Sequence, residues 1–417
     1  MHFFRLLFLF LAFGFLLQSC KSSEEFSGFS YDPEGATETT SKEITPQHKR
    51  TVGIEADGIW VSNEFDGARL SDFYKTNDTL YTAVIAPENA PINNSPWYSF
   101  KTWAEQDTTI WLKLQYRNGK HRYWPKLSTD KASWRRINPQ NYRVNNDSTA
   151  LLRLNLEASP LWVSAQELRT QPWFAQWADS LAARSYVTQD TAGYSHQQRP
   201  IRSLMISEVP EGEKRGVVII TGRLHPPEIT GNIAAYTFLE EIASSSERAH
   251  RFRREFAVIA YPFANPDGVQ NGHWRHNAGG VDLNRDWKAF NQPETQAIRD
   301  DLLDRLKNND RSRVYYGIDF HSTDENIFYP INRAVQTFPD DFTYRWLDAL
   351  TSNFPDTKFT IEPFDTSSPI TKNWIYHTFG ADAITYEVND RANRQNLKKI
   401  SRRAAQLMMQ QLLEEKH

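Results

Sequence analysis

Residues 217–243 read VVIITGRLHPPEITGNIAAYTFLEEIA, and this segment indicates the fold class of the chain. It begins with the apolar run 217–220, passes through TGRLHPPE, and continues as a helical pattern over 229–243. A short apolar strand that leads through a loop into a helix is the repeating unit of α/β folds. The segment therefore predicts such a unit, with polar residues suited to chemistry in its loop.

The same alternation continues toward the C-terminus. Apolar strand patterns at 256–261, 315–320 and 383–388 are interleaved with helical patterns, which lie at 294–306, 341–353 and 391–413. This order predicts a mixed sheet covered by helices, an α/β/α domain over residues 169–417. Open sheets of this kind place functional groups in loops beyond the strand ends.

Three residues of this region are candidate metal ligands. His225 and Glu228 stand three apart in the loop after the first strand, and His321 directly follows the strand at 315–320. Imidazole nitrogen and carboxylate oxygen suit zinc, and a set of two histidines and one glutamate leaves a fourth position for water. Each motif alone also fits a bland role, a surface H-x-x-E pair or a locally bonded strand-end histidine.

Residues 264–287 read ANPDGVQNGHWRHNAGGVDLNRDW. With H-x-x-E before it, this stretch resembles zinc carboxypeptidases of the M14 family, in which N-P-D-G, W-R and D-L-N-R follow in this order. The resemblance implies that Asn284 and Arg285 hold the terminal carboxylate of a substrate and that Arg275 stabilises the oxyanion. A guanidinium suits both tasks because it is permanently charged and offers forked donors. The alternative is a surface polar cluster.

Glu387 ends the apolar strand pattern at 383–388, where a buried carboxylate is costly without a partner. The family resemblance makes it the general base, which takes a proton from water and delivers one to the leaving amine. Lys372 lies fifteen residues earlier, about where classical members set the floor of the side-chain pocket, and would favour an acidic C-terminal residue. A strand-end glutamate bonded to arginine and a solvated lysine are the alternatives. The tyrosine that closes over the substrate in many members has no counterpart in 364–374, and Tyr376 fits it poorly.

Residues 50–168 carry strand patterns at 80–85, 109–114 and 150–154, and Asn118-Gly119 indicates a hairpin turn. Period-two patterning at this spacing predicts an antiparallel β-sandwich. Stretches at 65–68, 96–100, 111–114 and 133–136 resemble the sandwich that precedes the catalytic domain in cytosolic-type carboxypeptidases. Members of this branch remove C-terminal or branched glutamates.

The first residues have the pattern of a targeting segment. A twelve-residue apolar run at 6–17, too short to span a bilayer, ends in LQSC, which resembles a bacterial lipobox. We therefore expect a signal peptide over 1–19, lipid attachment at Cys20, and a flexible Ser/Thr/Glu/Gly-rich tether over 20–49. This would place the protein on the outer membrane of a bacterial cell envelope, facing the periplasm or the surface. An ordinary signal peptide with an incidental cysteine is the alternative.

The bulk composition limits the function further. Hydrophobic residues make up 39% and charged residues 24%, as in globular proteins, and 48 basic against 51 acidic residues argue against nucleic acid as a partner. We predict a metallocarboxypeptidase with one Zn²⁺ that hydrolyses the C-terminal bonds of peptides or proteins with zinc-activated water. The alternatives are a zinc amidase or deacylase acting on cell-wall peptides or acylated amino acids, and an inactive peptide- or glycan-binding surface lipoprotein. The sequence carries no signal for oligomeric state.

Overall fold

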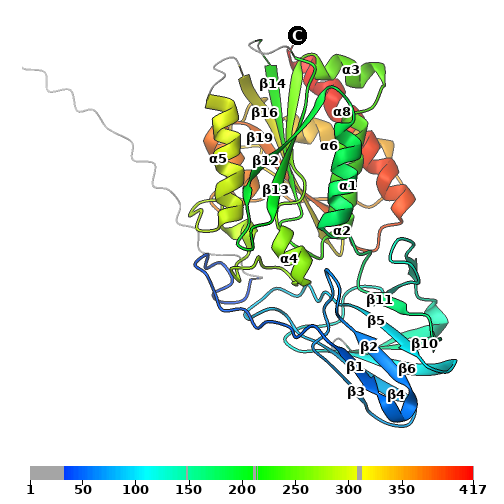
Figure 1. The fold of residues 1–417 in the computed structure, drawn as a ribbon. Coiled ribbons are helices and arrows are strands. Elements are labelled where there is room, and N and C mark those ends of the chain that lie inside the picture. The colour runs from blue at the N-terminus through cyan, green and yellow to red at the C-terminus, as the bar shows by residue number, and fades with distance from the viewer. Residues whose placement is uncertain (1–31, 147–148, 210–212, 214, 308–311, 417) are drawn as a thin grey trace, which may run out of the picture.

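The computed structural model describes residues 32–146, 149–209, 213, 215–307 and 312–416. It shows a strand-rich N-terminal body packed against a larger α/β body (Figure 1). The predicted signal segment 1–19 and Cys20 lie outside the described residues. In the part of the chain that the structure describes, no helix combines the length and apolarity needed to cross a membrane.

The N-terminal body is built from two sheets whose facing apolar residues join in one core. The first sheet has the order β1 (Thr51–Ile54), β2 (Ile59–Ser62), β5 (Ser99–Ala104), β11 (Leu161–Ser164), β7 (Lys126–Ser128) and β8 (Arg135–Arg136). The second has the order β3 (Asp72–Lys75), β4 (Leu80–Ile85), β6 (Thr108–Tyr116), β10 (Thr149–Leu156) and β9 (Tyr142–Asn146). Two short 3-10 turns, η1 (Glu55–Asp57) and η2 (Pro139–Asn141), connect strands.

The sandwich departs from the purely antiparallel prediction at one pair, because β4 and β6 run parallel. The intervening strand β5 belongs to the other sheet, so β4 and β6 enter their own sheet in the same direction. The predicted hairpin at Asn118-Gly119 is also wrong, since β6 and the next strand, β7, lie in different sheets. Asn118 does adopt the left-handed conformation of a turn, with φ 56°.

The C-terminal body confirms the predicted mixed sheet. Its eight strands have the order β12 (Val187–Tyr194), β13 (Pro200–Ile206), β15 (Phe256–Tyr261), β14 (Arg215–Gly222), β16 (Ser312–Thr323), β19 (Asp382–Asn389), β17 (Ile327–Pro330) and β18 (Thr360–Ile361). The four central strands β15, β14, β16 and β19 are parallel, and β12, β13 and β17 pair antiparallel with a neighbour. Parallel central strands bring their carboxyl ends to one edge of the sheet.

Helices cover both faces of this sheet (Figure 1). One face packs against α1 (Gln171–Ala182), α2 (Ile229–Ile242), α3 (Glu247–Arg253), α6 (Phe342–Asn353) and α8 (Arg394–Lys416), and the other against α5 (Pro293–Lys307) and α7 (Thr371–Phe379). Val218 and Ile220 of β14 join the first core, and Val217 and Ile219 join the second. The continuous apolar run of this strand is explained by burial on both faces. The short helix α4 (Pro266–Asn271) and the 3-10 turn η3 (Leu283–Arg285) lie in the long loop after β15.

Residues 32–49 belong to the segment expected to be a flexible tether, and here the structure differs. Residues 39 and 42 contact the α/β body: the Lys42 N–H donates to the Gly279 carbonyl at 2.8 Å, and the Thr39 carbonyl accepts from Gln292 Nε2 at 2.7 Å. Further on, the Thr45 N–H donates to the Glu88 carbonyl of the sandwich at 2.7 Å. The segment has few apolar residues and cannot bury enough surface within itself to become ordered alone. The rest of the protein supplies the partners that the segment lacks.

Candidate active site

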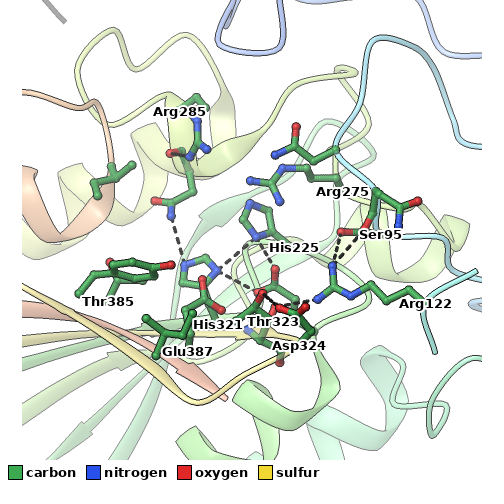
Figure 2. Close-up of a pocket in the computed structure, with 18 of the residues that line it drawn as sticks. Ser95, Arg122, His225, Arg275, Arg285, His321, Thr323, Asp324, Thr385 and Glu387 are labelled. Carbon is green, nitrogen blue, oxygen red and sulfur yellow. Dashed lines mark hydrogen bonds and ion pairs between the residues drawn. The ribbon is translucent and has the colours of Figure 1, made fainter. Parts of the chain in front are cut away.

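The carboxyl ends of three parallel strands bring the predicted chemical residues together (Figure 2). His225 and Glu228 lie in the loop between β14 and α2, while His321 and Glu387 belong to β16 and β19. The last two are register partners in adjacent strands, so their backbones are one strand spacing apart. The strand ends therefore fix the relative positions of the four side chains.

The three candidate metal ligands converge and are buried. His225 Nδ1 lies 2.8 Å from Glu228 Oε1, His321 Nδ1 lies 2.9 Å from Glu228 Oε2, and the two Nδ1 atoms are 3.2 Å apart. One ligand atom from each residue falls within 4.8 Å of the others. Such a set of nitrogen and carboxylate donors matches a zinc site with three protein ligands.

A further carboxylate contacts the far side of each imidazole. His225 Nε2 lies 2.9 Å from Asp282 Oδ1, and His321 Nε2 lies 2.7 Å from Asp319 Oδ2. When each Nε2 donates its proton to the neighbouring carboxylate, both Nδ1 lone pairs face Glu228. The two Nδ1 atoms and the Glu228 carboxylate are then all acceptors, and a bound cation would satisfy them. Burial would lower the pKa of His321, but Asp319 and Glu228 raise it well above its ordinary value, which shows how strongly this site favours positive charge.

The loop that carries His225 and Glu228 is shaped by two unusual positions. Arg223 is buried at a left-handed φ of 58°, and its Nε donates to the Pro226 carbonyl at 2.8 Å. Gly231, in the first turn of α2, approaches β16 so closely that a Cβ there would lie 2.2 Å from the carbonyl oxygen of His321. Glycine is therefore required at this point for the helix to hold the loop against the third ligand.

Glu387 faces the same cavity and is half-buried. Burial and the nearby Glu228 raise its pKa to about 7. Its Oε2 has no hydrogen-bond partner among the described residues. A carboxylate with a pKa near neutrality and an unsatisfied oxygen is suited to accept and return a proton.

Arg275 and Asn284 surround the metal triad. Arg275 Nε donates to Asp282 Oδ2 at 2.6 Å, and despite burial Asp282 and Glu228 raise the pKa of Arg275 above its ordinary value. Asn284 Oδ1 accepts from the Thr371 N–H at 3.1 Å. Both side chains therefore line the cavity in fixed positions.

Arg285 holds a carboxylate of the chain itself. Its Nε lies 2.9 Å from Asp32 Oδ2 and its Nη2 lies 3.3 Å from Asp32 Oδ1, with the two side chains only 3% and 4% exposed. Asn93 Nδ2 donates to the same carboxylate at 2.7 Å. This forked contact is the geometry in which a guanidinium binds the carboxylate end of a peptide.

The predicted metal-binding, catalytic and substrate-binding residues, except Lys372, line one cavity of about 340 Å³. The N-terminal body supplies part of its wall through Asn93, Asn94, Ser95 and Arg122. Figure 2 labels Ser95 and Arg122 beside the metal-ligand residues. Arg122 is held by Asp390, at 2.8 Å from Nε to Oδ2, and by the Ser322 carbonyl, at 3.2 Å from Nη2.

Lys372 is neither a pocket floor nor a solvated lysine. It is buried near the start of α7, and its Nζ lies 3.4 Å and 3.2 Å from the carbonyl oxygens of Phe364 and Asp365. Counting back from Glu387 misplaced it because the turn of α7 directs the side chain toward this loop. Tyr376 also lies away from the cavity, in an apolar cluster with Ile375, whereas Tyr329 of β17 lines it.

A sequence profile of the zinc carboxypeptidase family, Peptidase_M14, matches residues 174–410. The chain belongs to this family. Cytosolic carboxypeptidase 6 of Mus musculus is 24% identical over 281 residues, which is 62% of this chain and 52% of the relative. The human protein of the same name is also 24% identical over 281 residues, 62% of this chain and 56% of its own. The chain thus spans about half the length of these curated relatives.

Two solved structures share the fold of this zinc carboxypeptidase family member. A metallo-carboxypeptidase from Burkholderia cenocepacia aligns with a TM-score of 0.71 at 17% identity, over 86% of this chain and 98% of its own. One from Pseudomonas aeruginosa aligns with a TM-score of 0.68 at 18% identity, over 85% and 99%. These alignments extend beyond the catalytic domain, so the shared fold includes strands of the N-terminal sandwich.

Sequence reasoning missed several residues of the site. Asn93 and Arg122 line the cavity and Asp32 contacts Arg285, all from the N-terminal part of the chain, and no spacing in the sequence connects them to the site. Asp282 is the first residue of the D-L-N-R motif, two residues before Asn284. An acidic residue so close to two predicted site residues was the available signal for a carboxylate behind a metal-ligating histidine.

Proposed function

We propose that this protein is a zinc-dependent carboxypeptidase that removes residues from the C-termini of peptides. The observation that carries the proposal is that one cavity holds the His225, Glu228 and His321 donors together with Arg285 and Glu387. Membership of the family gives the reaction class. The arrangement of these side chains supports the assignment of roles.

The residues present fit zinc. Two imidazole nitrogens and a carboxylate face one point, and a carboxylate behind each imidazole orients the ring and raises its basicity as a ligand. When bound there, zinc would supply Lewis acid chemistry and lower the pKa of water.

Arg285, Arg275 and Glu387 carry out substrate binding, charge stabilisation and proton transfer, respectively. Arg285 binds the terminal carboxylate of the peptide and so fixes the last residue. Arg275 stabilises the negative charge that develops on the scissile carbonyl oxygen. Glu387 accepts a proton from the attacking water and delivers one to the leaving amine, tasks that its raised pKa favours near neutral pH.

A preference for acidic C-terminal residues is part of the proposal. The cavity wall carries three guanidinium groups. Arg285 is assigned to the terminal carboxylate and Arg275 to the scissile carbonyl oxygen, which leaves Arg122 as a further positive charge facing the cavity. A substrate with additional negative charge is therefore favoured. Lys372 does not contribute, because it does not line the cavity.

Glu387→Gln tests the proposal. The variant should lose at least about a hundredfold in kcat, the lower end of the range for a general base, while it still binds one zinc ion. Activity is measured as release of free amino acids from a panel of peptides that differ in the C-terminal residue, before and after chelation and after zinc is returned. Exposed Glu362→Gln is the matched control.

Parent-level hydrolysis by Glu387→Gln would remove the base assignment. Release of acyl groups or internal amides without free C-terminal amino acids would instead favour an amidase. Equal rates on peptides ending in glutamate and leucine would refute the acidic preference.

We also propose that the chain is lipid-anchored at Cys20 in a bacterial cell envelope. The motif LQSC after the apolar run at 6–17 supports this. Metabolic labelling with a fatty acid tests it: the full chain should take up label and Cys20→Ser should not. Equal labelling of both proteins would refute the anchor.

A further inference from the structure

The loop between β4 and β5 of the sandwich contacts the segment that carries Arg275. Glu88 is completely buried in this loop and accepts three consecutive backbone N–H groups. Its Oε2 accepts from Trp274 at 2.7 Å, and its Oε1 accepts from Arg275 at 3.0 Å and from His276 at 2.8 Å. Three successive N–H groups that converge on one carboxylate form an anion-binding nest.

The next residue of the loop strengthens the contact. Asn89 Oδ1 lies 2.6 Å from His276 Nδ1, and its Nδ2 donates to the Gly280 carbonyl at 3.0 Å. Two adjacent side chains of the sandwich thus hold residues 274–280 of the catalytic domain. This stretch contains Arg275 and ends two residues before Asp282.

Asp282 fixes the other end of Arg275. Its Oδ2 accepts from the Arg275 Nε at 2.6 Å while its Oδ1 lies 2.9 Å from the metal-ligand imidazole of His225. The backbone of Arg275 is therefore set by Glu88 and its guanidinium by Asp282. Neither anchor alone determines where the charge lies relative to the ligands.

Building on the proposed function, we infer that Glu88 is a positioning residue that acts through Arg275, so the sandwich takes part in transition-state stabilisation through a side chain that does not touch the substrate. A displacement of the backbone at 274–276 moves the guanidinium away from the developing oxyanion. Catalysis is sensitive to such shifts because the donors must be aimed in advance.

The alternative role is a plain structural connection between the two bodies. Burial would raise the pKa of Glu88, but His273, His276 and Arg69, with the Trp274 N–H, lower it, so the carboxylate is charged in the fold. A connection of this kind would contribute to stability, and its loss would affect every step of the reaction. A positioning role predicts a loss confined to the steps that use Arg275.

Glu88→Gln is the test because it keeps the size of the side chain but places an NH₂ group against N–H donors. In the zinc-loaded full chain, kcat should fall about 10- to 100-fold, part of the loss expected for an oxyanion donor, while KM stays within about twofold. Zinc content should be unchanged. Glu157→Gln, an exposed carboxylate of the same domain, is the control.

A double-mutant cycle separates positioning from structure. In the Arg275→Ala background, Glu88→Gln should produce no further loss of kcat, since the group that it positions is absent. Additive losses, a rise in KM alone, or an unchanged kcat would overturn the inference. If Glu88→Gln does not fold, Glu88→Asp replaces it in the same cycle and should show a smaller, equally non-additive loss.

Amide hydrogen exchange at 274–276 gives a readout that does not depend on activity. Exchange at these three amides should accelerate at least tenfold in Glu88→Gln and remain unchanged in Glu157→Gln. If the parent protein releases no C-terminal residues, the proposed function is refuted. Unchanged amide exchange in Glu88→Gln would separately refute the role of Glu88 in holding the backbone at 274–276.

Discussion

Replacing Asp32 with Asn should make the enzyme bind its substrates more tightly. In the structure the carboxylate of Asp32 occupies Arg285, the residue proposed to hold the terminal carboxylate of a peptide. The substrate must displace this internal ligand before it can bind. The apparent affinity is then reduced by the fraction of molecules in which Arg285 is accessible.

The size of the effect follows from the contact. A hydrogen-bonded contact to a charged group is worth about 1.5–3 kcal/mol, and both side chains here are almost completely buried. Since 1.4 kcal/mol is a factor of ten, KM should fall by about 10- to 150-fold in Asp32→Asn. The turnover number should not change, because Arg285 contacts the terminal carboxylate equally in the ground and transition states.

The assay is steady-state hydrolysis of a short peptide over a range of concentrations. Glu34→Gln, an exposed carboxylate two residues further on, serves as the control and should leave KM unchanged. An Asp32→Asn enzyme with the KM of the parent, or a higher one, would show that the contact does not compete with substrate.

Two further changes test the interior. Gly231→Ala should weaken zinc affinity and lower the free energy of unfolding by about 1–3 kcal/mol, because the added Cβ meets the His321 backbone. Zinc titration measures the first effect and denaturant unfolding the second. Parent values for both would show that the close approach of α2 to β16 does not require glycine. Lys372→Met tests a pH dependence: burial lowers the pKa of Lys372 to about 7, so the folded parent holds fewer protons than the unfolded chain between pH 7 and 10.5 and gains stability as pH rises. The variant should lack this gain, so that its unfolding free energy relative to the parent drops by about 2–4 kcal/mol from pH 7 to pH 10. A difference that does not change with pH would refute the burial argument.

The sequence predicted the elements with strong periodicity. The strand pattern at 217–220 corresponds to β14 and the helical pattern at 229–243 to α2. Both were predictable because the buried faces of strands and helices require apolar residues at regular spacing in the sequence. The edge strand β12 was missed since its pattern mixes exposed polar residues with few apolar ones. The helix α7 was also missed, because it is short.

The candidate site shows the same division. His225, Glu228, His321 and Glu387 were predicted because motif order and strand ends indicate where parallel strands deliver side chains. Glu88 could not be predicted, since its partners lie 186 to 188 positions away. They are backbone N–H groups, which nearly every residue carries, so residue identity does not mark them. Long-range contacts between a side chain and a main chain leave no pattern along the chain.

The two-part wall of the cavity has a consequence for how such an enzyme diversifies. His321 and Glu387 lie on central strands, where a change disturbs the whole sheet, whereas residues 93–95 belong to a loop of a separate domain. Loops tolerate replacement better than the strands of a packed sheet. Selection, or an engineer, can therefore exchange residues 93–95 to alter which peptides are admitted, while Glu88 and Asn89 earlier in the same loop continue to hold the segment that carries Arg275.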